Sequence, residues 1–152
     1  MTRQEMIDLA KKIAVTYTLD PALVCAVCHH ESAGWNTWAS RHEPAFYIKY
    51  IEPMVDLKTF GPTCSRATER MHRATSYGLM QIMGQVARER GFSGEYLTEL
   101  CDPAVGIEYG CKELARRMKN ANGDVTKALL GYNGGANPEY PKFVMTHYQE
   151  YV

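Results

Sequence analysis

The sequence predicts a mainly α-helical protein, and two observations carry that prediction. Asp20-Pro21 and Asp102-Pro103 each place an aspartate before a proline. The aspartate can accept a hydrogen bond from the first free backbone N–H groups of a helix, and proline at the first helical position loses nothing by lacking its own N–H. No stretch shows the sustained alternation of apolar and polar residues that is typical of a strand. The fold class is therefore mainly α.

Four helices follow from caps and periodicity. Residues 3 to 18 carry apolar side chains at helical spacing. Asp20 should open a helix that runs to about Ser32, and Asp102 one that runs to about Lys119. Asp124 should cap a shorter helix that ends before the "NGG" at 133 to 135. Further helices are expected at 45 to 52, 65 to 74, 79 to 90 and 138 to 150, with an ordered, aromatic-rich excursion over 33 to 63.

Length and composition limit the classes of function. A chain of 152 residues is long enough for one domain with its own core, so we expect a single domain over 1 to 152 and a monomer. Lys plus Arg and Asp plus Glu both number 17, so net charge predicts no nucleic-acid partner. No apolar run approaches the ~20 residues of a membrane helix, and no signal peptide is visible. A role outside the cell would then require delivery by a virion, a lysis system or a secretion machine.

The five cysteines are expected to be free. Their number is odd, and Cys25-x-x-Cys28 lies in a predicted helix interior without a second CxxC to complete a zinc set. Free buried thiols are the ordinary state of such residues. A disulfide between Cys64 and Cys101 stays open as an alternative.

The segment His29-His30-Glu31 does not predict a metal site. Successive residues of a helix diverge by about 100°, so these three side chains cannot close around one ion while the helix continues. The HExxH spacing, which does place two imidazoles on one face, is absent. The remaining histidines, at 42, 72 and 147, show no ligand spacing with this pair. We expect no metal and no cofactor.

Glu31 is instead a candidate for proton transfer. In the helix from Pro21 it follows Val24, Val27 and Cys28 by seven, four and three residues, so it shares their apolar face. A carboxyl group beside apolar surface favours its neutral form, which raises its pKa toward neutral pH. The alternative is a glutamate that ends a helix in solvent.

Three segments read in order resemble the soluble lytic transglycosylase (SLT) domain. They are "ESAGWNTWAS" (31 to 40), "SYGLMQIM" (76 to 83) and "LLGYNGG" (129 to 135), with "LCDPAVGIEYGCKEL" (100 to 114) between the last two. The chain looks most like compact or phage-associated members. It departs from the family pattern at Thr37, where proline is usual, and at Gly131 and Gly134, where alanine is usual. The connection over 41 to 75 is also longer.

The resemblance implies a lysozyme-like fold with a substrate cleft and a peptidoglycan glycan strand as the partner. Members of the family cleave the β-1,4 bond between N-acetylmuramic acid and N-acetylglucosamine. Their single catalytic glutamate corresponds to Glu31. It acts first as acid and then as base, and the product carries a 1,6-anhydro ring.

The resemblance also assigns roles around Glu31. Tyr132 should hydrogen-bond the glutamate, and Met80 and Gln81 should line the cleft, with Asn133 beside them. Ser32 is expected either to bind substrate or to serve as a hydroxyl at the helix end. Tyr77, like Trp38, Tyr47 and Tyr50, could stack on a sugar ring or pack in the core.

A second carboxylate is a further possibility. Glu43 could approach the cleft as a general base, as in glycosidases that use two acids, or pair with Arg41 at the surface. Three functions stay open on this basis. They are a lytic transglycosylase with Glu31 alone, a hydrolytic muramidase with Glu43 as second acid, and a wall-binding or structural component of a phage tail or secretion apparatus without turnover.

Overall fold

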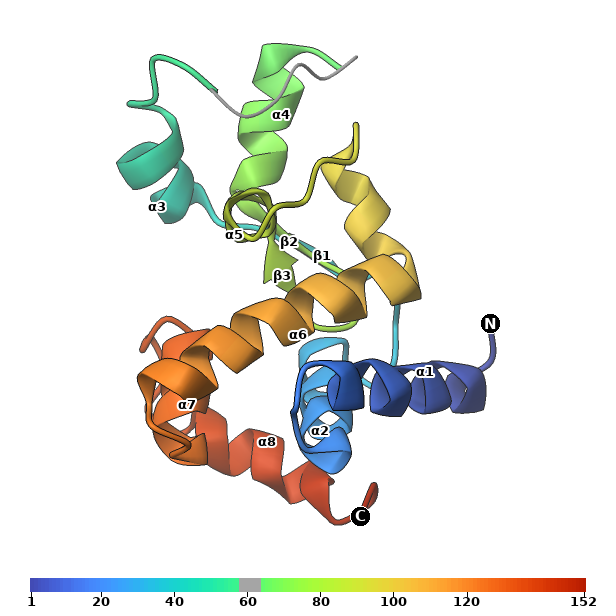
Figure 1. The fold of residues 1–152 in the computed structure, drawn as a ribbon. Helices are drawn as coiled ribbons and strands as arrows, with labels where there is room; N and C mark the ends of the chain where they lie inside the picture. The colour runs from blue at the N-terminus through green and yellow to red at the C-terminus, as the bar shows by residue number, and fades with distance from the viewer. Residues whose placement is uncertain (58–63) are drawn as a thin grey trace.

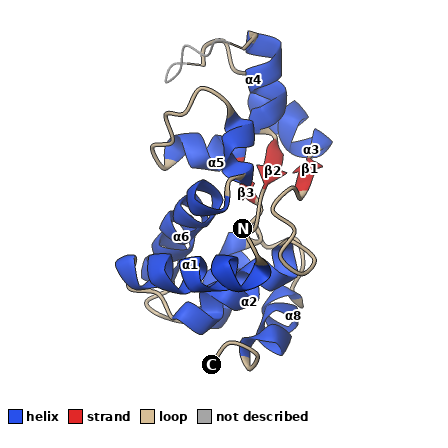
Figure 2. Cartoon of the chain, turned by 90° about the vertical axis from the view of Figure 1, so that its right-hand side faces the viewer, coloured by secondary structure: helices blue, strands red, loops and turns tan. Residues whose placement is uncertain are grey.

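The computed structural model describes residues 1–57 and 64–152, and these are mostly helical, as the sequence predicts. The α-helices are α1 (Arg3–Thr16), α2 (Pro21–Glu31), α3 (Pro44–Phe46), α4 (Arg66–Arg73), α5 (Gly84–Glu89), α6 (Pro103–Asn120), α7 (Val125–Tyr132) and α8 (Tyr140–Tyr148). A π-helical turn (Tyr47–Ile51) continues α3, and a 3-10 helix (Leu97–Cys101) precedes α6. The strands are β1 (Ser40–His42), β2 (Thr75–Tyr77) and β3 (Ile82–Met83). Figures 1 and 2 show their arrangement.

The predicted aspartate caps are all formed. The Asp20 carboxylate accepts from the Ala22 N–H at 2.8 Å, and the Asp102 carboxylate accepts from two backbone N–H groups of α6. Asp124 accepts from the Lys127 N–H at 3.0 Å. Because each cap occupies donors that the helix cannot satisfy internally, α2, α6 and α7 begin where their sequences predict.

The helix predicted over 79 to 90 begins only at Gly84, and the residues before it form an antiparallel hairpin of β2 and β3. Gly78 and Gln81 have φ angles of +75° and +47°, which are incompatible with a right-handed helix. A Cβ at position 78 would lie 2.3 Å from the carbonyl oxygen of Leu100, so the turn requires glycine there. With β1, which pairs Ser40 with Tyr77, the hairpin completes a small three-stranded sheet. Figure 2 shows this sheet between α4, which lies above it, and α1, α2 and α8, which lie below it.

Two apolar clusters form the core, and α6 contributes to both. The larger cluster packs α1, α2, α7 and α8 around α6 and buries Ile107 and Leu114. The smaller one lies under the sheet, α5 and the 3-10 helix, and Val105 and Tyr109 of α6 pack against it. In Figure 1, α6 crosses the middle of the molecule between these parts. One helix therefore fixes how the sheet part lies relative to the helical part.

A buried ion-pair cluster, which the sequence analysis did not identify, joins α4 to α5. The carboxylate of Glu69, fully buried, accepts from Arg73 Nε at 3.0 Å and from Arg88 Nε at 2.8 Å. Arg88 also donates to the carbonyl oxygens of Phe92 and Gly94. A buried carboxylate is tolerated only when it is paired and hydrogen-bonded in this way.

All five cysteines are free, as expected, and the alternative disulfide between Cys64 and Cys101 is not formed. Cys25, Cys28 and Cys111 are buried. Burial raises the pKa of the Cys25 thiol to about 11, so it stays protonated near neutral pH. Within the described residues, none of the helices has the length and apolar character to cross a membrane.

Candidate active site

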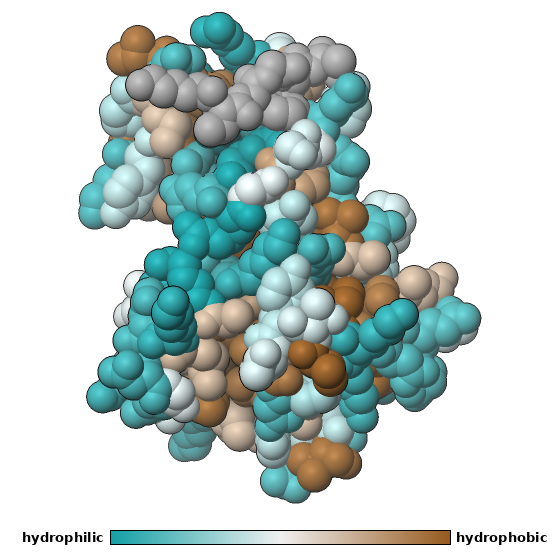
Figure 3. All heavy atoms as spheres, viewed as in Figure 1, coloured by the Kyte–Doolittle hydropathy of each residue, from teal (hydrophilic) through white to brown (hydrophobic). Residues whose placement is uncertain are grey.

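A pocket of about 570 Å³ lies between the two parts of the molecule and contains Glu31. Its walls come from the end of α2, from the segment of β1 and α3, from the β2–β3 hairpin, from α6, and from α7 with the turn that follows it. Figure 3 shows the surface indented at its left edge, between the part that carries α3 and α4 and the part that carries α6 and α7, with hydrophilic residues gathered around the indentation.

Glu31 is the last residue of α2, and it is half-buried in the pocket wall. Val24, Val27 and Cys28, which share its face, are fully buried as predicted. Burial raises the pKa of the Glu31 carboxyl group to about 6, against the lowering effects of a hydrogen bond from Tyr140 and of the Arg41 charge. A carboxyl group with this pKa exchanges a proton readily near neutral pH.

The hydroxyl that contacts Glu31 belongs to Tyr140, not to Tyr132. Tyr140, at the start of α8, donates to Glu31 Oε1 at 2.5 Å. Tyr132 also lines the pocket, but its hydroxyl donates to the carbonyl oxygen of Met80 at 2.7 Å. The expected hydrogen bond between Tyr132 and Glu31 is thus replaced. No local pattern in the sequence identifies Tyr140, because its role depends on how α8 packs against α2.

Met80 does not line the pocket with its side chain, which is a correction to the sequence-based expectation. The side chain is fully buried. It lies against α6 at Gly110, where a Cβ would come within 2.5 Å of the Met80 sulfur. Met80 therefore acts through its backbone carbonyl, which holds the Tyr132 hydroxyl in the pocket wall.

Two further candidates are buried rather than exposed to a ligand. Ser32 has no exposed surface, and its hydroxyl donates to the Cys28 carbonyl and accepts from the Trp35 N–H. Of its two expected roles it has the one at the helix end. Tyr77 is 5% exposed and packs edge-on against His72, so it belongs to the smaller apolar cluster. Neither residue is in contact with the pocket.

Gln81 and Asn133 both line the pocket, and their expected role in substrate binding stays a prediction. The Gln81 amide nitrogen donates to the backbone carbonyls of Ala39 and Gly78, which leaves its amide oxygen as the group available to a ligand. The Asn133 amide nitrogen is buried and has no hydrogen-bond partner among the described residues. Since buried donors are rarely left unpaired, a ligand in the pocket is a natural acceptor for it.

Glu43 lines the same pocket as Glu31, and it also pairs with Arg41, whose Nε lies 3.0 Å from Glu43 Oε1. Glu43 thus forms the expected ion pair and also lies in the pocket wall, while its role as a general base stays a prediction. The pair lies in the segment of β1 and α3, across the pocket from α6 and α7.

Several pocket residues were not identified from the sequence, among them Phe46 on α3 and Glu113 and Arg117 on α6. The spacing of Glu113 and Arg117, four residues apart on one helix, predicts an ion pair but not its position in a pocket. Phe46 lies in the aromatic-rich segment, where nothing local separates it from its neighbours.

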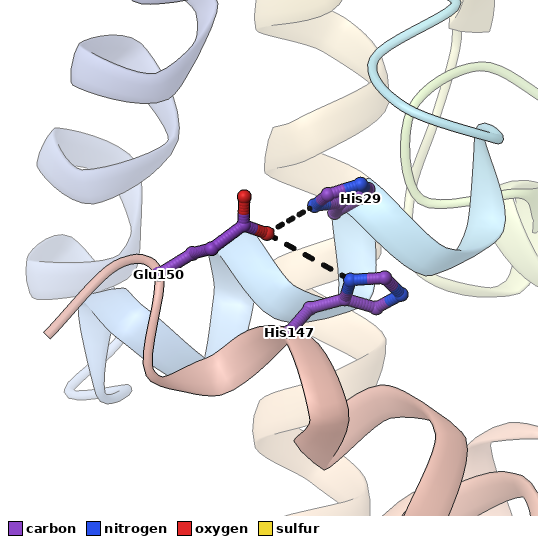
Figure 4. Close-up of side chains that lie close together, drawn as sticks. All are labelled: His29, His147 and Glu150. Atoms are coloured by element: carbon purple, nitrogen blue, oxygen red, sulfur yellow. Dashed lines mark ion pairs between the residues drawn. The ribbon is translucent and has the colours of Figure 1, made fainter.

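His29, His147 and Glu150 form a cluster outside this pocket, shown in Figure 4. Their possible metal-ligand atoms lie within 4.8 Å of one another. Among the described residues, these three side chains are the group whose spacing could hold a metal ion. Packing of α8 on α2 brings His147 beside His29, a proximity that spacing in the sequence did not reveal. Glu150 already faces both imidazoles, and the Tyr151 hydroxyl also bonds His29. We therefore assign the cluster to holding the C-terminal segment on α2.

Comparison with known families identifies the class of protein that this fold and pocket belong to. The Transglycosylase SLT domain family matches residues 8–144 of the 152 in the chain. The chain therefore belongs to the Transglycosylase SLT domain family, within the lysozyme-like superfamily. No solved structure matches it significantly. The family is one of peptidoglycan lytic transglycosylases, which agrees with the resemblance carried by the sequence motifs.

Proposed function

We propose that the chain cleaves the β-1,4 bond between N-acetylmuramic acid and N-acetylglucosamine in peptidoglycan, with Glu31 as the single acid and base. The observation that carries the proposal is the enclosed carboxyl group of Glu31, which has a pKa of about 6 and a tyrosine hydroxyl on one oxygen, in a pocket large enough for sugar units. The site of action is then the cell wall, reached through a virion, a lysis system or a secretion machine.

In the first step, protonated Glu31 donates its proton to the glycosidic oxygen as the bond from that oxygen to C1 of the muramoyl sugar breaks. The acetamido group of the same sugar stabilises the positive charge at C1, as the family resemblance implies. Glu31 is then ionised, and the Tyr140 hydroxyl stabilises its carboxylate by donating to Oε1.

In the second step, the carboxylate of Glu31 takes the proton from the C6 hydroxyl of the muramoyl sugar, and O6 bonds to C1. The product is a 1,6-anhydro sugar, Glu31 regains its proton, and no water is consumed. A carboxyl group that must first give and then take a proton works best with a pKa near the working pH. The pKa of about 6 for Glu31 meets this requirement.

Asn133 and Gln81 are proposed to bind the sugar. The unpaired amide nitrogen of Asn133 would donate to an acetamido or hydroxyl oxygen, and the Gln81 amide oxygen would accept from a sugar hydroxyl. Tyr132 shapes the wall between them and is fixed by the Met80 carbonyl.

Substitution of Glu31 by glutamine tests the proposal. Glu31→Gln preserves shape but has no proton to donate, so release of soluble fragments from purified cell wall should fall by about a thousand-fold or more. The fold should persist, because removal of a carboxylate whose ionised form is disfavoured by burial does not weaken it. Glu139→Gln, an exposed acid on the α8 side, is the matched control and should keep full activity. Substantial cleavage by Glu31→Gln would exclude Glu31 as the acid.

A second candidate function is hydrolysis, and the position of Glu43 in the same pocket favours testing it. In that case Glu43 would activate a water, and the products would be heavier by one water than anhydro products. Mass spectrometry of digested muropeptides separates the two reactions. We expect anhydro products from the unmodified chain and from Glu43→Gln alike, whereas hydrated products that disappear in Glu43→Gln would establish the muramidase instead.

A further inference from the structure

Arg117 introduces a positive charge into a pocket that is proposed to hold an uncharged glycan. N-acetyl sugars carry no charge along the chain, so a guanidinium group has no ionic partner among them. The muramoyl sugar, however, bears a side chain that ends in carboxylate, either its own lactyl group or the peptide attached to that group. We propose that Arg117 forms a subsite that binds a carboxylate of this side chain, a proposal that rests on the proposed function.

The charges around Arg117 are not balanced. The Glu113 carboxylate is almost fully buried and accepts from Arg117 Nε at 2.8 Å. It also accepts two hydrogen bonds from Arg116, and Arg90 lies 3.8 Å away. The only other acid that pairs with these arginines in the described part of the chain is Glu89, 4.0 Å from Arg90. Three guanidinium groups thus share two carboxylates, and one positive charge is left beside the pocket.

The guanidinium of Arg117 is also oriented for an additional ligand. Its Nε bonds Glu113, while its two terminal nitrogens make no hydrogen bond within residues 1–57 and 64–152. The side chain is 33% exposed and lines the pocket. Terminal nitrogens of arginine form a planar fork that matches the two oxygens of a carboxylate. Arg41 on the opposite wall is not equivalent, because its charge is paired with Glu43 and its side chain is 76% exposed.

Gly131 leaves room for this arrangement. A Cβ at position 131 would lie 3.1 Å from Arg117 Cδ and 3.5 Å from Nη1, so an alanine would press on the arginine side chain. Gly131 is one of the positions where the chain departs from the alanine of the family pattern. Glycine in place of alanine at position 131 and the path of the Arg117 side chain therefore have one explanation. Without the methyl group, the Arg117 side chain can pass over α7 to the pocket.

Binding measurements on the full chain with Glu31→Gln, which prevents turnover, test the subsite. The probes are soluble glycan fragments from peptidoglycan in three forms. One form is intact, one is stripped of peptide so that the lactyl carboxylate is free, and one has every carboxylate converted to a neutral methylamide. The dissociation constant of each is measured by titration calorimetry. The lactyl carboxylate is free only in the stripped form, because the intact form holds it as an amide to the peptide. The form that presents the recognised carboxylate, intact or stripped, should therefore bind about ten-fold more tightly than the methylamide form.

The variants locate the effect. In Arg117→Gln the form that bound most tightly should bind no better than the methylamide form, and in Gly131→Ala the difference between these two forms should shrink. Arg116→Gln is the matched control, because Arg116 shares Glu113 but does not line the pocket, and it should keep the ten-fold difference. Weak binding of the stripped form assigns the carboxylate to the peptide, and strong binding assigns it to the lactyl group.

Two results would overturn the subsite. One is binding of both the intact and the stripped form no tighter than that of the methylamide form by the chain with Arg117 in place, and the other is a ten-fold difference that survives in Arg117→Gln. Since the measurement needs no turnover, it is read independently of cleavage. Failure of the unmodified chain to cleave cell wall would contradict the proposed function alone.

Discussion

At the scale of single residues, the site depends on two opposed influences on one carboxyl group. Enclosure of Glu31 disfavours its charged form, whereas the Tyr140 hydroxyl favours that form by donating to Oε1. The result is a pKa of about 6. The protonated acid begins the proposed reaction, so kcat/KM should fall as pH rises through this value.

The Tyr140→Phe variant should change the pH at which kcat/KM falls. Loss of the hydrogen bond removes an effect that lowers the pKa of Glu31, so the alkaline limb of the kcat/KM profile should shift to higher pH. Rates of cell-wall cleavage between pH 4 and pH 9 would show this. Tyr148→Phe, which removes a hydroxyl of the same helix that bonds Asp20, is the control. A limb that stays in place, or that moves to lower pH, would show that Tyr140 does not act on Glu31.

The residues also show what sequence can and cannot reveal about the site. The apolar face of α2 predicts from spacing alone that Glu31 is partly buried beside Val24, Val27 and Cys28, because that relation is contained within one helix. Tyr140, Phe46 and Arg117 were not identified, since packing between separate elements brings Tyr140 to Glu31 and the other two to the pocket. The motif that contains Met80 and Gln81 located the right segment but not the direction of the Met80 side chain.

At the scale of elements, the starts of helices with aspartate caps were predictable from the sequence, and the short strands were not. Three aspartate caps define the starts of α2, α6 and α7. By contrast, β1, β2 and β3 have only two or three residues each, too few for a visible alternation of apolar and polar side chains. The helix predicted from residue 79 begins only at Gly84, because Gly78 and Gln81 have positive φ angles. The Leu100 carbonyl, distant in sequence, lies where a Cβ at position 78 would be, so this turn requires glycine.

The packing of α6 on the hairpin gives a prediction for Gly110→Ala. An added Cβ would lie 2.5 Å from the sulfur and 2.6 Å from the Cβ of Met80, so the variant should lose about 1 to 3 kcal/mol of unfolding free energy. Because the Met80 carbonyl holds Tyr132, cleavage should weaken too. Urea denaturation measures the first effect and cell-wall release the second.

A double variant supplies the check on that explanation. Met80→Ala removes the sulfur and the Cγ that the new methyl group would strike and leaves only the Met80 Cβ, so Gly110→Ala with Met80→Ala should cost less than the two single changes added together. Strict additivity would mean that the two residues do not compete for the same space.

At the scale of the whole molecule, the sheet part depends on the ion cluster at Glu69 as well as on apolar burial. Glu69→Ala would leave Arg73 and Arg88 buried without their carboxylate, and the free energy of unfolding should fall by about 3 to 5 kcal/mol. Glu52→Ala, an exposed acid of the same part, should change it by less than about 0.5 kcal/mol. Thermal denaturation of both variants makes the comparison, and equal midpoints would show that the cluster contributes little.

The single helix between the two cores also determines how the pocket can move. Gly106 and Gly110 are the positions of α6 where a helix bends most easily, yet each is covered at close range, one by the Leu100 carbonyl and the other by Met80. Neither can serve as a hinge without breaking its contact. The two walls of the pocket should therefore stay at a fixed distance from each other when a ligand binds. A glycan strand would have to adapt its ring shape to the protein, rather than the protein closing around the strand.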